Sequence, residues 1–177
     1  LFAAAGFCVL ATDANPATRD SATARLAETL NSRVAAGKLL PDDRDQTLAR
    51  FQIVARPQDM APAAMVIEAI IENLAAKQGL FAVLESVIAP GAVLATNTSS
   101  LSVANLASPV THPERVLGLH FFNPAPVMKL VELVGHKGTS DTAMARARDL
   151  TELAEIYQLL DQLEPIERDP LTYRPQQ

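Results

Sequence analysis

The chain has a single cysteine and no tryptophan, and aromatic residues make up only 5% of its 177 positions. One cysteine, Cys8, cannot form a disulfide within the chain, which predicts a reducing compartment, the cytoplasm. Because Cys8 lies in an apolar run, we interpret it as a small core residue. No apolar run approaches the roughly 20 residues of a membrane helix, and no charged signal-peptide segment precedes the first residues. We therefore expect a cytoplasmic protein without a membrane partner.

Charge and short motifs argue against further classes of protein. The net charge of −5 argues against a nucleic-acid surface, where basic residues would cluster. The sequence has no metal-ligand spacing, and it has no glycine-rich phosphate loop, although a dinucleotide site normally uses one. What it does have is a hydrophobic content of 49%, dominated by Ala, Val and Leu. This composition and length suit one compact domain in which helices pack on a buried sheet.

The order of apolar and polar segments predicts strands that alternate with helices. Strands are expected over residues 7–12, 51–54, 65–70, 92–96, 116–122 and 130–134, and helices over residues 17–36, 41–49, 74–88 and 102–107. This alternation is typical of βαβ units and a mostly parallel sheet. Residues 139–163 are expected to form one or two amphipathic helices, with an apolar stripe of Leu150, Leu153, Ile156, Leu160 and Leu163, before a frayed tail. We therefore divide the chain into an α/β domain, residues 1–138, and a divergent helical segment and tail, residues 139–177.

The segment from His120 to Glu132 places a histidine and a carboxylate on two predicted strands joined by a proline-rich turn. If the strands pair antiparallel about Pro126, positions 120 and 132 lie opposite each other and close enough to interact. A histidine oriented by a carboxylate is the simplest general base near neutral pH. The alternative, a core histidine satisfied by a backbone carbonyl, stays open, although the facing Glu132 argues for chemistry.

Polar residues lie at or just past the ends of several predicted strands. They are Asp13, Glu72, Asn97, Ser99 and His120. Ligands of parallel sheets collect at the carboxyl ends of the strands, so these residues predict a site at one rim.

Each of these rim residues also has a purely structural interpretation. Asp13 suits the two ribose hydroxyls of NAD, but it also suits the N-cap of the next helix, for which Asn15 competes. Ser99 suits a substrate hydroxyl, but the polar run from Asn97 to Ser100 also suits helix capping. Glu72, with Lys77, also suits a solvated helix start.

Three longer motifs strengthen the functional interpretation. They are Val66-Ile-Glu-Ala-Ile-Ile-Glu-Asn73, Thr96-Asn-Thr-Ser-Ser-Leu101 and Gly118-Leu-His-Phe-Phe-Asn-Pro-Ala-Pro-Val-Met-Lys-Leu-Val-Glu132. In these motifs the chain resembles the 3-hydroxyacyl-CoA dehydrogenase family from Leu1 to about Leu150. The resemblance implies a Rossmann-like α/β fold with helices on both faces of the sheet. It also implies NAD as cofactor and oxidation of L-3-hydroxyacyl-CoA to 3-ketoacyl-CoA.

The resemblance also implies roles for individual residues. His120 matches the catalytic base, Glu132 the carboxylate that orients it, Ser99 a residue that bonds the substrate oxygen, and Asn123 a polar group beside the base. Asp13, Glu72, Lys77 and Asn97 are expected to contact the cofactor, and the helical arm over residues 17–49 the CoA, with Lys38 as a phosphate contact. An acyl-CoA substrate, a homodimeric parent protein and a place in fatty-acid β-oxidation are further implications.

Two departures from the family pattern affect the expected activity. The family opens with a strand, a GxGxxG turn and a helix, whereas Leu1–Gly6 resembles only the end of that helix, with Gly6 as its cap. The missing strand would lie between those that lead to Asp13 and to Glu72. After about Leu150 the chain no longer follows the family, so we expect a fragment with impaired activity. A non-catalytic remnant, or a related dehydrogenase acting on another hydroxy acid, are the alternatives.

Overall fold

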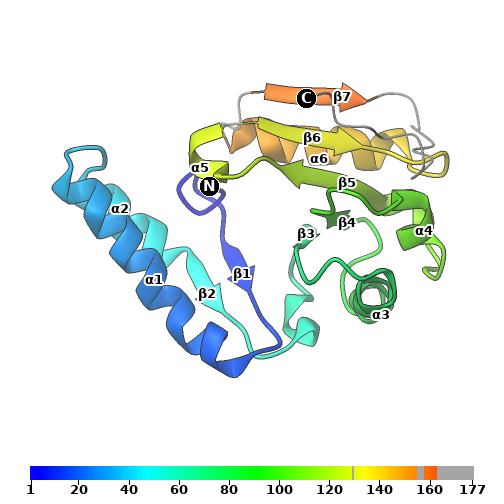
Figure 1. The fold of residues 1–177 in the computed structure, drawn as a ribbon, viewed down its shortest axis with the longest axis horizontal. Coiled ribbons are helices and arrows are strands. Elements are labelled where there is room, and N and C mark those ends of the chain that lie inside the picture. The colour runs from blue at the N-terminus through cyan, green and yellow to red at the C-terminus, as the bar shows by residue number, and fades with distance from the viewer. Residues whose placement is uncertain (129, 155–157, 163–177) are drawn as a thin grey trace, which may run out of the picture.

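The computed structural model describes residues 1–128, 130–154 and 158–162, which form two β-sheets with helices around them (Figure 1). The smaller sheet pairs β1 (Val9–Ala11) with β2 (Phe51–Ile53) in parallel. The larger sheet has the order β3 (Met65–Glu68), β4 (Val93–Thr96), β5 (Val116–Phe121), β6 (Leu130–Val134) and β7 (Gln158–Gln162). Strands β3, β4 and β5 are parallel, β6 runs antiparallel to β5, and β7 is parallel to β6. The predicted α/β fold is confirmed.

Helices cover both faces of the larger sheet, because its strands are apolar on both sides. Leu94 and Val116 pack in one core with α3 (Leu74–Glu85) and α4 (Val103–Ala107). Their neighbours along the strands, Val93 and Leu117, pack in the opposite core with α6 (Asp141–Leu153). This exchange of faces at each step is the two-residue period of a β-strand. The remaining short helices are η1 (Pro57–Met60), η2 (Pro113–Arg115) and α5 (Ala125–Met128).

The smaller sheet carries the helical hairpin of α1 (Pro16–Ala35) and α2 (Pro41–Ala49). Asn15 caps the start of α1 with its side chain, so Asp13 is not the N-cap. Gly37 follows the end of α1 with φ +68°, a conformation that glycine adopts without steric cost. In the described part of the chain, no helix is long and apolar enough to span a bilayer.

Helix α6 buries a different face from the one that we predicted. Its buried residues are Ala143, Ala147 and Thr151, whereas Leu153 is 66% exposed. Small side chains at this four-residue spacing let the helix pack closely on the sheet. Leu160 lies in strand β7 instead of a helix, so the predicted leucine stripe is wrong there. Ile156, Leu163 and the predicted tail lie outside the described residues.

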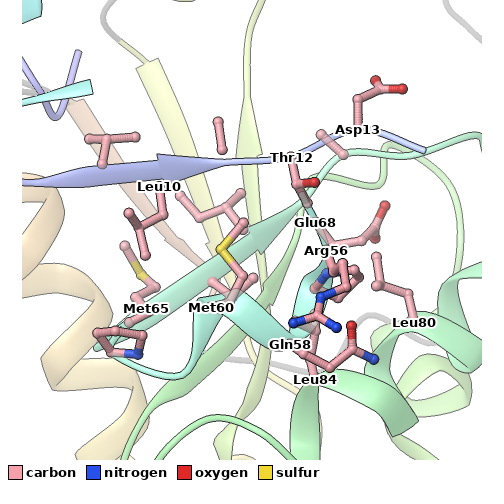
Figure 2. A pocket seen from close by; sticks show the side chains of 18 of the residues that line it. Leu10, Thr12, Asp13, Arg56, Gln58, Met60, Met65, Glu68, Leu80 and Leu84 are labelled. Carbon is pink, nitrogen blue, oxygen red and sulfur yellow. The ribbon is translucent and has the colours of Figure 1, made fainter. Parts of the chain in front are cut away.

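An open groove of about 1030 Å³ separates β1 from β3, and apolar side chains line most of it (Figure 2). Labelled among them are Leu10, Met60, Met65, Leu80 and Leu84. The groove lies between the strands that lead to Asp13 and to Glu72, where the family resemblance places a further strand. Cys8 lies at this groove and is exposed, so its prediction as a core residue is wrong.

Candidate active site

The predicted histidine–carboxylate pair forms across strands β5 and β6. His120 and Glu132 are direct partners in the antiparallel ladder, and His120 Nδ1 lies 2.9 Å from Glu132 Oε2. Both side chains are about four-fifths buried, with 19% and 18% of their surfaces exposed. A carboxylate only accepts hydrogen bonds, so Nδ1 carries the proton and donates a hydrogen bond to Glu132. Nε2 is then the unprotonated nitrogen of the neutral ring, and it can accept a proton.

Ser99 lies against that free nitrogen. Its Oγ is 3.1 Å from His120 Nε2, and the hydroxyl donates to the ring in this tautomer. The contact arises because β4 and β5 are parallel neighbours, so the loop after β4, which carries Ser99, lies at the same rim as the end of β5, which carries His120. Helix α4 is capped by Ser102, whose side chain accepts from Asn105 N, so Ser99 is not needed as a cap.

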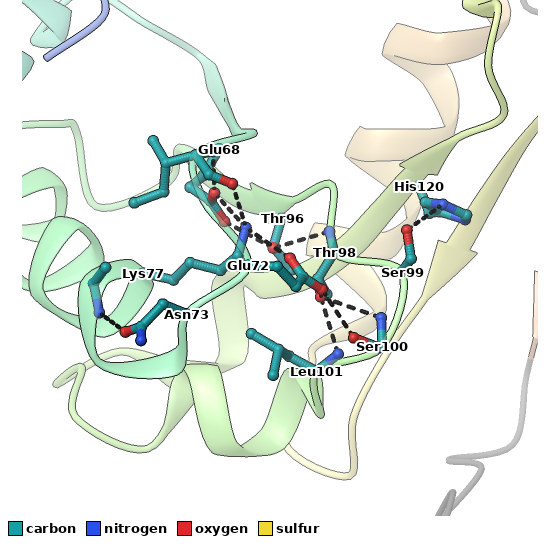
Figure 3. A network of polar contacts seen from close by, with 12 residues as sticks. Glu68, Glu72, Asn73, Lys77, Thr96, Thr98, Ser99, Ser100, Leu101 and His120 are labelled. Carbon is teal, nitrogen blue, oxygen red and sulfur yellow. Dashed lines mark hydrogen bonds and ion pairs between the residues drawn. The ribbon is translucent and has the colours of Figure 1, made fainter. Parts of the chain in front are cut away.

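A polar network anchors the loop that carries Ser99 (Figure 3). The hydroxyls of Thr98 and Ser100 both donate to Glu72 Oε1. Burial alone would raise the pKa of the Glu72 carboxyl, but hydrogen bonds from Thr98, Lys77 and Ser100 outweigh it and hold the pKa below its ordinary value. Glu72 therefore stays ionised and bonds the residues on both sides of Ser99.

Lys77 is not a solvated residue at a helix start. Its side chain is 1% exposed, and Nζ lies 2.6 Å from Glu68 Oε1 and 3.3 Å from Glu72 Oε2. Our sequence prediction missed Glu68, a fully buried carboxylate at the end of β3. A signal was present, because a charge inside the apolar run Met65–Ile70 is tolerated in a buried strand only when it is paired.

The other predicted site residues do not all lie beside the His120–Glu132 pair. Asn97 Oδ1 accepts from Phe121 N, which ties the end of β4 to the end of β5. Asn123 is exposed in the turn just past β5. Asp13 is exposed at the far side of the groove, where its Oδ1 accepts from Asn15 N. Lys38 is exposed in the segment between α1 and α2.

Together these residues form a rim that can abstract a proton from a bound hydroxyl. The free Nε2 of His120 is placed so that it can accept a proton, Glu132 is placed so that it can stabilise the imidazolium, and the Ser99 hydroxyl lies beside Nε2. Asp13 lines the groove, and an exposed carboxylate can accept hydrogen bonds from hydroxyl groups. Within the described residues, no group of three or more His, Cys, Asp or Glu side chains could hold a metal ion.

Comparison with known proteins gives a consistent result. Residues 1–155 match the family described as "3-hydroxyacyl-CoA dehydrogenase, NAD binding domain". The chain is 48% identical over 122 residues to 3-hydroxyadipyl-CoA dehydrogenase of Escherichia coli, covering 69% of this chain and 26% of that protein. It is 39% identical over 151 residues to a probable 3-hydroxybutyryl-CoA dehydrogenase of Bacillus subtilis, covering 85% of this chain and 52% of that protein.

Solved structures agree with the sequence comparison. The crystal structure of 3-hydroxybutyryl-CoA dehydrogenase from Escherichia coli superposes with a TM-score of 0.86 at 41% identity, covering 90% of this chain and 34% of that one. FadB2 of Mycobacterium tuberculosis gives the same TM-score at 37% identity, covering 90% of this chain and 56% of that one. The chain thus spans between about a quarter and about half of the length of these curated relatives.

Proposed function

The chain belongs to the 3-hydroxyacyl-CoA dehydrogenase family, as its NAD-binding domain, and we propose that it takes part in oxidising L-3-hydroxyacyl-CoA to 3-ketoacyl-CoA. The observation that carries this proposal is the arrangement of Ser99, His120 and Glu132, with contacts of 3.1 and 2.9 Å on the two ring nitrogens. The family match to the NAD-binding domain confirms the prediction that NAD is the cofactor.

In the proposed reaction His120 Nε2 takes the proton of the 3-hydroxyl as the C3–H bond breaks and the C3–O bond becomes a carbonyl. NAD, when bound, supplies the acceptor for the hydride that leaves C3. Glu132 holds the ring in the tautomer that leaves Nε2 free, and it stabilises the cation after proton transfer. Ser99 Oγ lies beside Nε2, within reach of a substrate oxygen held there.

Asp13 at the groove, together with polar residues beyond the ends of β3 and β4, suits the two ends of a dinucleotide. Asp13 offers an exposed carboxylate beyond the end of β1, which can accept from both hydroxyls of the adenosine ribose. A 2′-phosphate at the same place would be repelled, so we propose a preference for NAD over NADP. For the other end we propose Asn97, which follows β4, and Glu72, which follows β3. Lys77 of α3 acts there through its buried ion pairs with Glu68 and Glu72.

The substrate and assembly follow from the same proposal. We propose an acyl-CoA substrate, with Lys38 on the helical hairpin as a contact for its phosphate groups and Asn123 as a polar group beside the base. We further propose that the protein acts in the cytoplasm, that its parent protein is a homodimer, and that it takes part in fatty-acid β-oxidation.

Two measurements test the proposal. Isothermal titration of the purified chain with NADH is expected to show micromolar binding, and NADPH is expected to bind at least about tenfold more weakly because of Asp13. Oxidation of NADH with acetoacetyl-CoA, followed at 340 nm, is expected to be slow and to be lost in His120→Asn but not in His112→Asn. His112 is the matched control because its side chain is exposed and its ring pairs with Glu114, two residues away. Absence of NADH binding would leave the alternative, a non-catalytic remnant.

A further inference from the structure

The buried carboxylate of Glu68 lies at the start of a chain of contacts that ends beside the proposed catalytic pair (Figure 3). Its side chain is fully buried, yet each of its oxygens has a partner from a different element. Oε1 accepts from Lys77 Nζ of α3 at 2.6 Å, and Oε2 accepts from Thr96 Oγ1 of β4 at 2.9 Å. Oε1 also accepts from Ile70 N at 2.6 Å, which shapes the loop after β3. A buried charge with these three partners fixes the mutual positions of three segments.

One route from Glu68 to the Ser99 loop is direct. Thr96 Oγ1 donates to Glu68 and at the same time accepts from Thr98 N at 3.3 Å. The position of the Glu68 carboxylate therefore sets the position of the Thr98 backbone. Thr98 immediately precedes Ser99.

The second route passes through a pair of charges. Lys77 Nζ lies between Glu68 and Glu72, at 2.6 and 3.3 Å from their oxygens. Glu72 in turn accepts from the hydroxyls of Thr98 and Ser100, the two neighbours of Ser99. Removing the charge of Glu68 would leave the buried ammonium of Lys77 with Glu72 as its remaining charged partner, which disturbs the position of both.

Both routes converge on Ser99, whose Oγ is 3.1 Å from His120 Nε2. Ser99 itself is exposed, so packing contributes little to its position, and the bonds of its neighbours hold it. We propose that Glu68 is a positioning residue for the Ser99–His120 contact, acting through Thr96 on one side and through Lys77 and Glu72 on the other. The Ser99–His120 contact is a feature of the structure itself. Only its importance for catalysis rests on the proposed function.

The test compares Glu68 with Glu85, a second paired carboxylate, which lies at the end of α3 and is 14% exposed. Glu85 pairs with Arg115 at 3.7 Å and accepts from Thr111 N and His112 N. Arg115 directly precedes β5, whereas His120 lies near the other end of that strand. The readouts are the ¹⁵N chemical shift of His120 Nε2 in the whole chain without ligands, and the urea midpoint of unfolding. Ser99→Ala sets the full displacement of the Nε2 signal that accompanies loss of the contact.

Glu68→Gln keeps the shape of the side chain and removes its charge. We expect Glu68→Gln to move the Nε2 signal by at least about half of the displacement that Ser99→Ala causes. In a protein that already carries Glu68→Gln, Ser99→Ala is expected to move the signal less than it does in the unaltered chain. Glu85→Gln is expected to lower the urea midpoint while leaving the Nε2 signal in place. A Glu68→Gln protein that loses stability like Glu85→Gln, with its Nε2 signal unmoved, overturns the proposal.

Two features keep the test decisive. If Glu68→Gln does not fold, Thr96→Val replaces it, because this near-isosteric change removes only the hydroxyl of the direct route. Its Nε2 signal must then move towards that of Ser99→Ala, and an unmoved signal overturns the proposal. The measurement needs no NADH or acyl-CoA, so failure of cofactor binding would refute the proposed function without touching this result.

Discussion

The Nδ1 atom of His120 lies 2.9 Å from Oε2 of Glu132 because the two residues face each other directly across the β5–β6 ladder. A second histidine shows the opposite arrangement. His136 Nε2 lies 3.0 Å from the Pro113 carbonyl oxygen, and its Nδ1 accepts from Gly138 N. A carbonyl only accepts, so His136 carries its proton on Nε2, whereas His120 carries it on Nδ1. The two rings are thus held in different tautomers by their neighbours.

The first prediction concerns this tautomer. Glu132→Gln is expected to mix the two tautomers of His120, because the amide can donate as well as accept, whereas the carboxylate only accepts. Two-dimensional ¹H–¹⁵N spectra of the histidine rings measure the mixture directly. The pattern of His136 in the same spectrum is the internal control and should not change. If His120 in the variant keeps Nδ1 fully protonated, Glu132 does not set its tautomer.

The second prediction concerns the buried ion pair. Lys77→Met leaves the Glu68 carboxylate buried with its ammonium partner removed, which is expected to cost about 3–5 kcal/mol of unfolding free energy. The double variant Glu68→Gln/Lys77→Met is expected to lose less than the single one, because neither charge is then buried alone. Urea unfolding measures both. As a control, Asp45→Asn removes an exposed ion pair with Arg44 and should change stability little. Equal losses in the single and double variants would contradict the assignment.

The third prediction concerns the groove between β1 and β3. Val9 N and Ala11 O bond towards β2, so the intervening Leu10 amide points into the groove. On β3, Ala64 O and Glu68 O accept hydrogen bonds from β4 and the residue that follows it. The amides of Met65 and Ile67 therefore point away from β4, into the groove. These three amides are expected to exchange with solvent orders of magnitude faster than those of Leu117 and Leu119 in the central strand β5. Hydrogen exchange followed by NMR tests this, and equal protection in both groups would show that the groove edges are paired in solution.

The fourth prediction concerns stability in acid. Burial alone would raise the pKa of Glu85, but the N–H groups of Thr111 and His112 and the charge of Arg115 outweigh it and hold the pKa below its ordinary value of 4.5. Because the folded pKa is depressed, the stability contributed by Glu85 is present above about pH 4.5 and is lost as the pH falls through the folded value. Glu85→Gln is expected to lower stability at neutral pH and to flatten its decline in acid. Urea midpoints measured from about pH 6 to pH 3 test this. A decline as steep as that of the unaltered chain would contradict it.

The sequence was sufficient for features whose partners are close along the chain. The strand and helix order followed from local apolar periods, and each predicted element from residue 7 to residue 134 is present within a few residues of its expected ends. The opposition of His120 and Glu132 was predictable because a short turn between antiparallel strands fixes which residues face each other. The motifs around these residues were sufficient for the family as well.

Tertiary structure alone decided the features whose partners are distant. The role of Glu68 was missed because its charge is stabilised by Lys77 and Thr96, which arrive from other elements as the sheet assembles. Cys8 has the local sequence of a core residue and is nevertheless exposed, because the groove beside β1 leaves that edge open.

The sequence by itself thus determined the fold class, the family and the histidine–carboxylate pair. Only the tertiary structure brought Ser99 to His120, since their contact spans 21 residues and depends on β4 and β5 lying side by side. The same was true of the face that α6 buries, where Ala143 and Ala147 pack because the sheet demands close approach. Local patterns record the preferences of each segment, whereas burial and charge pairing depend on which segments meet.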